Sequence, residues 1–185
     1  MNVFLLHDEP YRAAYMHHDK HVVKMPLESA QMISTALRLI YERKPSSLIV
    51  PPSVINVLYE KTHEHHPWVK WLHDALCDAL DGGCDARAKM FLWHSHGLSL
   101  VYKLRYGRDH ASRNIIVLAM DLLGMDRPSP IGRWSDFETP LCMPDKYKVK
   151  GFSNVDCYRL YYMGEKMEGQ SWTSMGMIDA QDMVP

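Results

Sequence analysis

The chain has 185 residues, of which 46% are hydrophobic and 23% are charged, and its 21 basic and 22 acidic residues leave a formal net charge of -1. This composition fits a single globular domain with a real hydrophobic core and excludes wholesale disorder. The balanced charge argues against a protein coated in basic surface, although it leaves room for a local basic groove. No apolar run approaches the roughly 20 residues that span a bilayer, so we expect a cytoplasmic protein without membrane contact.

The first predicted elements are a short extended segment and two helices. Residues 2–6 form either a strand or a buried lead-in, and Pro10 opens a helix that runs to about His18. Asp19 is a candidate N-cap for the next helix. Pro26 should either kink this helix or mark its true start. Helical periodicity predicts that one apolar stripe of this helix faces the core: Val23, Leu27, Ala30, Ile33, Leu37 and Ile40.

The remainder of the chain is also predicted to be helical up to a long loop. We expect helices over residues 53–59, 67–81 and 85–106, and a further helix capped by Asp109. Four prolines then impose an irregular segment on residues 124–152, and Ser153 with Asp156 resembles a capping box for a last helix through about Lys166. The predicted fold is all-α: a single compact helical domain over residues 1–168, with a short N-terminal extended segment, a long proline-rich loop before the last helix and a loosely held tail, 169–185.

The densest group of chemically active side chains lies at the start of the second helix. Residues separated by four, three and four positions lie on one side of this helix, and here they are His17, His21, Lys24 and Glu28. Imidazoles, lysines and carboxylates packed this closely can tune one another's pKa values, as acid–base sites require. The alternative is a solvated face with pairs at i,i+4. The candidate catalytic residues are therefore His17, Asp19, Lys20, His21, Lys24 and Glu28.

A metal site is a second interpretation of the same helix. His17 and His21 are spaced to share one ion, and a third ligand would have to come from His7, His63, His65 or His66. The sequence does not show that convergence, so we expect no cofactor and keep a divalent metal as the alternative.

Three further blocks suit contact with phosphate. His66 precedes the first helical turn at Pro67, and residues 87–116 carry six basic side chains against the single carboxylate of Asp109. These basic residues and those of residues 146–166 are interleaved with tyrosines, a pattern typical of phosphate contact combined with base stacking. The alternative is aromatic core positions with a solvated charged rim. The candidate substrate- or phosphate-binding residues are His66, Arg105, Tyr106, His110, Lys148, Arg159, Tyr162 and Lys166.

The cysteines indicate a reducing compartment. Cys77, Cys84, Cys142 and Cys157 form no CxxC pair, and Cys77 and Cys142 lie among aliphatic residues. We therefore expect reduced, buried thiols and no disulfides.

These blocks together resemble a family of small, largely uncharacterised proteins of tailed bacteriophages. Its members begin with Met-Asn-aliphatic-aromatic and carry a His-x-Asp-Lys-His-Val-Val-Lys-Met block, which matches residues 17–25 here and is followed by Glu28 and Gln31. The other matching blocks are His66-Pro67 and residues 102–110, 143–148 and 158–166. The resemblance covers nearly the whole chain and implies a phage protein that works in the cytoplasm of the host cell.

A shorter resemblance concerns the phage pyrimidine-dimer DNA glycosylase/AP lyases, which are small all-α proteins. The matches are His17, Met25-Pro26 and the aromatic segment 158–166. Those enzymes attack with the α-amine exposed after removal of Met1, whereas Asn2 is bulky and retention of Met1 is expected; their catalytic glutamate aligns with Lys24. The resemblance therefore implies that Lys20 or Lys24 replaces the amine, with Asp19 or Glu28 as the carboxylate.

Three functions follow from these patterns. We favour a phage-type DNA-processing enzyme that excises a base through a Lys/carboxylate/His site, in which His17 or His21 would manage protons near neutral pH. The alternative is an enzyme acting on free nucleotides or modified bases, in phage nucleotide metabolism or DNA hypermodification. The third is a non-catalytic, host-modulating binding protein. The expected partner is accordingly DNA or a nucleotide.

Overall fold

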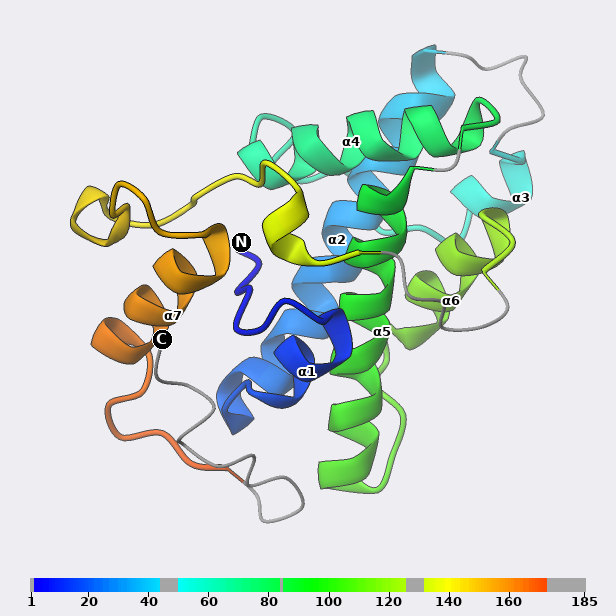
Figure 1. The fold of residues 1–185 in the computed structure, drawn as a ribbon. Coiled ribbons are helices and arrows are strands. Elements are labelled where there is room, and N and C mark those ends of the chain that lie inside the picture. The colour runs from blue at the N-terminus through cyan, green and yellow to red at the C-terminus, as the bar shows by residue number, and fades with distance from the viewer. Residues whose placement is uncertain (1, 44–49, 84, 126–131, 173–185) are drawn as a thin grey trace.

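Two long helices, α2 (Asp19–Arg43) and α5 (Ala86–Tyr106), pack against each other at the centre of the molecule (Figure 1). The computed structural model describes residues 2–43, 50–83, 85–125 and 132–172, which contain helices and no strand, so the all-α prediction is confirmed for them. Around the central pair lie α1 (Pro10–Tyr15), α3 (Pro52–Ile55), α4 (Pro67–Leu80), α6 (Arg113–Leu122), α7 (Asn154–Glu165) and the 3-10 turns η1 (Trp134–Asp136) and η2 (Asp145–Tyr147).

Local signals in the sequence determine several helix ends. Pro67 begins α4, Gly107 ends α5 in the left-handed conformation with φ 68°, and Ser153 with Asp156 forms the expected capping box of α7. The helix expected after Asp109 begins later, at Arg113, because residues before it form a turn in which the Ser112 N–H donates to His110 Nδ1. Helix α1 likewise ends at Tyr15 and not at about His18.

Helix α2 continues through Pro26, which is therefore not its start, and it faces the core with a different side than expected. Val23 and Leu27 are 47% and 39% exposed. Val22, Met25 and Pro26 are buried instead, as is Ser29, so the predicted stripe is wrong at its N-terminal end. Residues 22, 25, 26 and 29 also have helical spacing, and packing against the neighbouring elements selects this side.

The N-terminal extended segment lies in the core without pairing as a strand. Val3, Phe4, Leu5 and Leu6 are all less than 5% exposed, and Phe4 packs against the tyrosines of α7. The tail is partly docked, since Ser171 O accepts the Asp19 N–H; residues 173–185 of the predicted tail lie outside the described residues. Within the described part of the chain, no helix is long and apolar enough to cross a membrane.

Candidate functional site

A cluster of imidazole and aromatic rings is buried where the N-terminus of α2 meets α7. His17 and His18 are 0% and 2% exposed, and His21 follows on the first turn of α2. The His21 ring stacks on Phe4 at 4.7 Å between centroids and on His18 at 4.0 Å. Tyr162 of α7 contacts all three histidines. The sequence placed His17 and His21 on one helix, but α2 begins at Asp19, so His17 lies in the link before it. The fold adds Phe4 and Tyr162 from either end of the chain.

Hydrogen bonds determine which nitrogen of His17 carries the proton in this cluster. Tyr162 Oη accepts the His18 N–H and lies 3.0 Å from His21 Nδ1, where either atom can be the donor. His17 Nδ1 donates to the Ala13 carbonyl at 2.8 Å, which leaves the lone pair on His17 Nε2; that atom is buried without a hydrogen-bond partner among the described residues. Burial lowers the pKa of His21 to about 3 and of His18 to about 4, and lowers that of His17 well below its usual value. The rings are therefore neutral at pH 7, contrary to the expectation that His17 or His21 exchanges protons near neutral pH.

The carboxylate of Glu28 lies beside this cluster and is bound on both oxygens. Lys24 Nζ lies 2.8 Å from Oε1, and the backbone N–H of Asn2 donates to Oε2 at 2.9 Å. The Glu28 side chain is only 10% exposed, whereas Lys24 is 65% exposed and Lys20 is also at the surface. The charge of Lys24 contributes to the low pKa of His21. The carboxylate of Glu28 and the ammonium group of Lys24 are thus in contact, and Lys24 is near enough for its charge to act on His21.

Asp19 and Arg105 form a separate, buried ion pair. Arg105 Nη1 donates to Asp19 Oδ1 at 3.0 Å and to the His17 carbonyl at 2.8 Å, and its Nη2 donates to the Tyr15 carbonyl at 3.2 Å. The Arg105 side chain is 1% exposed, and the second oxygen of Asp19 accepts from the Ser171 hydroxyl. This arginine holds the link between α1 and α2 together and does not face solvent, where a phosphate would bind.

Two of the expected phosphate ligands of the middle blocks have local structural roles. His66 is the N-cap of α4, where its Nδ1 accepts the Trp68 N–H. His110 Nε2 contacts the Val23 carbonyl, and Tyr106 is 37% exposed at the end of α5.

Two of the four C-terminal candidates lie at the histidine cluster, and the other two lie elsewhere. Tyr162 belongs to the histidine cluster, and Lys166 lies close enough for its charge to lower the pKa of His21, with its ammonium group over the Tyr161 ring at 4.9 Å. Arg159 instead donates to a backbone carbonyl of the N-terminal segment, and Lys148 forms an exposed ion pair with a carboxylate three residues before it. The structure therefore brings together His17, His21, Lys24, Glu28, Tyr162 and Lys166, and it places Asp19 with Arg105 next to them.

The basic stretch of residues 87–116 is largely neutralised. Arg87 pairs with two carboxylates, Lys103 and Arg113 share Asp109, and Arg105 is buried. Asp78 and Asp85, which pair with Arg87, and Asp19, which pairs with Arg105, lie outside the stretch and reduce its excess of positive charge.

Sequence reasoning missed two members of the cluster. His94 of α5 lies 5.5 Å from the His17 ring, and its Nδ1 contacts the Pro10 carbonyl at 3.2 Å. Asn2, treated only as a possible obstacle at the N-terminus, supplies the second nitrogen on Glu28. A histidine in an otherwise buried stretch of α5 was the one available signal for His94; nothing in the sequence marked Asn2 as a neighbour of Glu28.

Neither a metal site nor a family assignment emerges from this geometry. In the described ranges, no three histidine, cysteine, aspartate or glutamate side chains are grouped to hold a metal ion. Comparisons of the chain with models of protein families, with curated proteins and with solved structures found no match. The arrangement of the side chains therefore carries the functional argument.

Proposed function

We propose that the chain is a DNA-processing enzyme of the glycosylase/AP-lyase type, with Glu28 as the catalytic carboxylate and Lys24 as the nucleophile. The supporting observation is the nearly buried carboxylate of Glu28, which contacts Lys24 Nζ on one oxygen and the Asn2 N–H on the other. Asp19, the other candidate carboxylate, is engaged by Arg105. Glu28 is therefore the better candidate.

The chemistry follows the order of a nucleophilic displacement at the sugar. Lys24 Nζ, after giving a proton to Glu28, attacks C1′, and the glycosidic bond breaks as the base leaves with the electron pair and takes up a proton. Opening of the sugar ring then gives an imine on Nζ and a hydroxyl on C4′. His21 is neutral, so it orients groups by hydrogen bonding and does not act as an acid.

Borohydride trapping on duplexes that contain an abasic site or a pyrimidine dimer tests this proposal. We expect a covalent adduct on Lys24 in the unmodified protein and none in Lys24→Ala. Glu28→Gln, which keeps the size of the side chain, should slow trapping by about 10²- to 10⁴-fold. Lys103→Ala is the matched control, because Lys103 is a half-exposed lysine with a carboxylate partner elsewhere, and this variant should trap normally.

Two results would remove the proposal. One is the absence of any trapped adduct or strand cleavage on these duplexes. The other is an adduct that peptide mapping places on Lys20 or on an α-amine, with Lys24→Ala fully active, which would contradict the assignment of the nucleophile.

A second candidate, an enzyme acting on free nucleotides or modified bases, has one specific observation in its favour. In the stretch 87–116, Arg87 and Lys103 are paired with carboxylates and Arg105 is buried, which leaves fewer charges for a long polyanion than the sequence suggests. Binding of a duplex with several phosphate contacts should weaken about 10³-fold or more between 50 and 200 mM salt. Thermal stabilisation by mononucleotides, combined with no duplex binding at low salt, would favour this candidate.

A further inference from the structure

One face of α4 carries a thiol next to a histidine and a carboxylate. Lys70, His73, Asp74 and Cys77 follow at i, i+3, i+4 and i+7 and so share this face. His73 Nδ1 lies 2.9 Å from Asp74 Oδ1, and its Nε2 lies 3.7 Å from Cys77 Sγ and 3.2 Å from Arg43 Nη1. The His73 side chain is 7% exposed, so these contacts account for both ring nitrogens.

The partners determine which nitrogen of His73 carries the proton. An ionised carboxylate only accepts hydrogen bonds, so Nδ1 carries the proton that binds Asp74. A guanidinium group only donates, so Nε2 presents its lone pair to Arg43. Cys77 Sγ lies 3.7 Å from the same nitrogen. Nε2 becomes the base for Cys77 once the Arg43 N–H leaves it, and the charge of Arg43 favours the thiolate that results.

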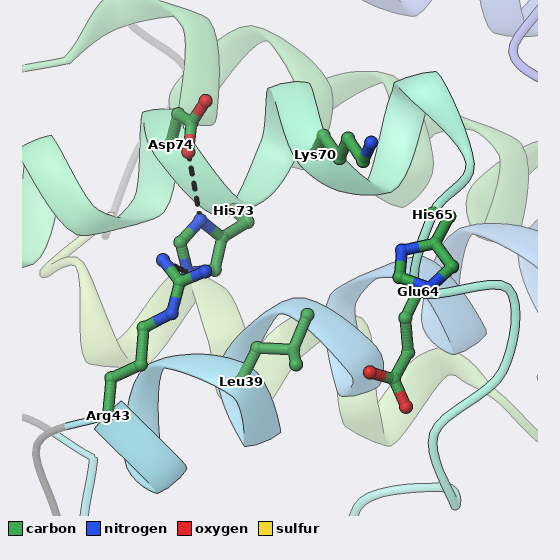
Figure 2. Close-up of a pocket in the computed structure, with 7 residues that line it drawn as sticks. All are labelled: Leu39, Arg43, Glu64, His65, Lys70, His73 and Asp74. Atoms are coloured by element: carbon green, nitrogen blue, oxygen red, sulfur yellow. Dashed lines mark hydrogen bonds and ion pairs between the residues drawn. The ribbon is translucent and has the colours of Figure 1, made fainter.

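Lys70, His73 and Asp74 of this face line a cavity of about 320 Å³, and Cys77 follows one helical turn beyond its lining (Figure 2). Arg43, His73 and Asp74 form one wall, and Lys70, His65 and Glu64 form the other.

The charges in the cavity are unequally compensated. The Asp74 carboxylate contacts His73, and the Glu64 carboxylate lies 3.3 Å from Lys61. Lys70 has neither a hydrogen bond nor an ion pair with any residue in the described part of the chain. Arg43 and Lys70 are thus cations that remain open to the carboxylates of a ligand.

We propose that Cys77 is a nucleophilic thiol that undergoes exchange with a small disulfide carrying carboxylates, of the oxidised glutathione class, which Arg43 and Lys70 bind. The Arg43 N–H moves from His73 Nε2 to a carboxylate of the disulfide, which frees the lone pair to take the thiol proton, and the thiolate attacks one sulfur of the disulfide. A new S–S bond forms on Cys77 as the old one breaks, and the leaving thiolate takes the proton back from His73. This site is independent of the proposed excision chemistry.

The other described cysteines provide internal controls. Cys142 is also partly exposed, but burial raises the pKa of its thiol. Cys157 is buried, and its thiol contacts the Val149 carbonyl. Neither has a hydrogen bond to an imidazole among the described residues, so Cys77 should react first.

The test measures exchange rates on the folded, reduced protein by intact mass and peptide mapping. The two probes are oxidised glutathione and the neutral bis(2-hydroxyethyl) disulfide. We expect Cys77 to form the glutathione mixed disulfide at least about ten times faster than Cys142. His73→Gln should slow both probes, whereas Lys70→Met should slow only oxidised glutathione, and added salt should weaken that preference. Lys103→Met, at a distant exposed lysine, should change neither rate.

Three outcomes would overturn the proposal. Equal rates at Cys77 and Cys142 in the unmodified protein would show that the thiol is not activated, without reliance on any variant. An unchanged rate in His73→Gln that folds normally would remove the base. Equal slowing of both probes by Lys70→Met would remove recognition of the carboxylates.

Discussion

Arg105 was expected from the sequence to bind phosphate, and its surroundings predict a large structural effect instead. Arg105→Met keeps most of the aliphatic stem and removes the guanidinium group. The substitution deletes the ion pair with Asp19 and the hydrogen bonds to the His17 and Tyr15 carbonyls. Because the Arg105 side chain is 1% exposed and that of Asp19 is 16% exposed, little water reaches the groups left behind.

The magnitude follows from the cost of leaving one partner of a buried pair. Removing one member costs about 3–5 kcal/mol, mostly because the remaining charge lacks compensation. The two carbonyls add to this cost, whereas partial hydration of Asp19 reduces it. We therefore expect a loss of about 3–5 kcal/mol in the free energy of unfolding, which for a chain of this length lowers Tm by roughly 6–20 °C.

Urea and thermal unfolding followed by circular dichroism measure this loss. Arg12→Met is the matched control, since the Arg12–Glu9 pair is 65% and 60% exposed and should contribute at most about 0.5 kcal/mol. The reasoning is refuted if Arg105→Met stays within about 1 kcal/mol of the unmodified protein. If that stable variant also lost affinity for nucleic acid, Arg105 would be a phosphate ligand after all.

Two further predictions concern the core. Burial lowers the pKa of His94 to about 4 from 6.5, so the unfolded chain binds a proton that the folded chain excludes. The stability that this residue contributes is complete above pH 6.5 and is lost as the pH falls towards 4, by up to about 1.4 kcal/mol per pH unit. In His94→Gln, the free energy of unfolding measured in urea should therefore depend less steeply on pH in that window. An unchanged slope would contradict this prediction. In Gly97→Ala, the added Cβ would lie 2.9 Å from Ala14 Cβ, where α1 crosses α5. Although alanine has the better helix propensity, we expect the free energy of unfolding to fall by about 1–3 kcal/mol. Thermal unfolding measures this loss, and a gain in Tm would be the contrary result.

The sequence alone determined the class of fold and most helix boundaries, because these depend on neighbours along the chain. A proline at the first turn, a left-handed glycine and a reciprocal capping box act within a few residues. The boundaries at Pro67, Gly107 and Ser153 were therefore predictable. Helical spacing also placed His21, Lys24 and Glu28 correctly on one helix, whereas His17 lies in the link before α2.

Only the tertiary structure decided which of these side chains are buried and what they contact. Two adjacent apolar stripes of α2 both have helical period, and packing selected the one containing Val22 and not Val23. The partners of the charged groups are distant in sequence: Arg105 binds Asp19 from 86 residues away, and Asn2 reaches Glu28 from 26 away. The composition of a segment gives the number of its charged side chains. How many of those charges remain available to a ligand depends on long-range pairing and burial, which only the folded chain determines.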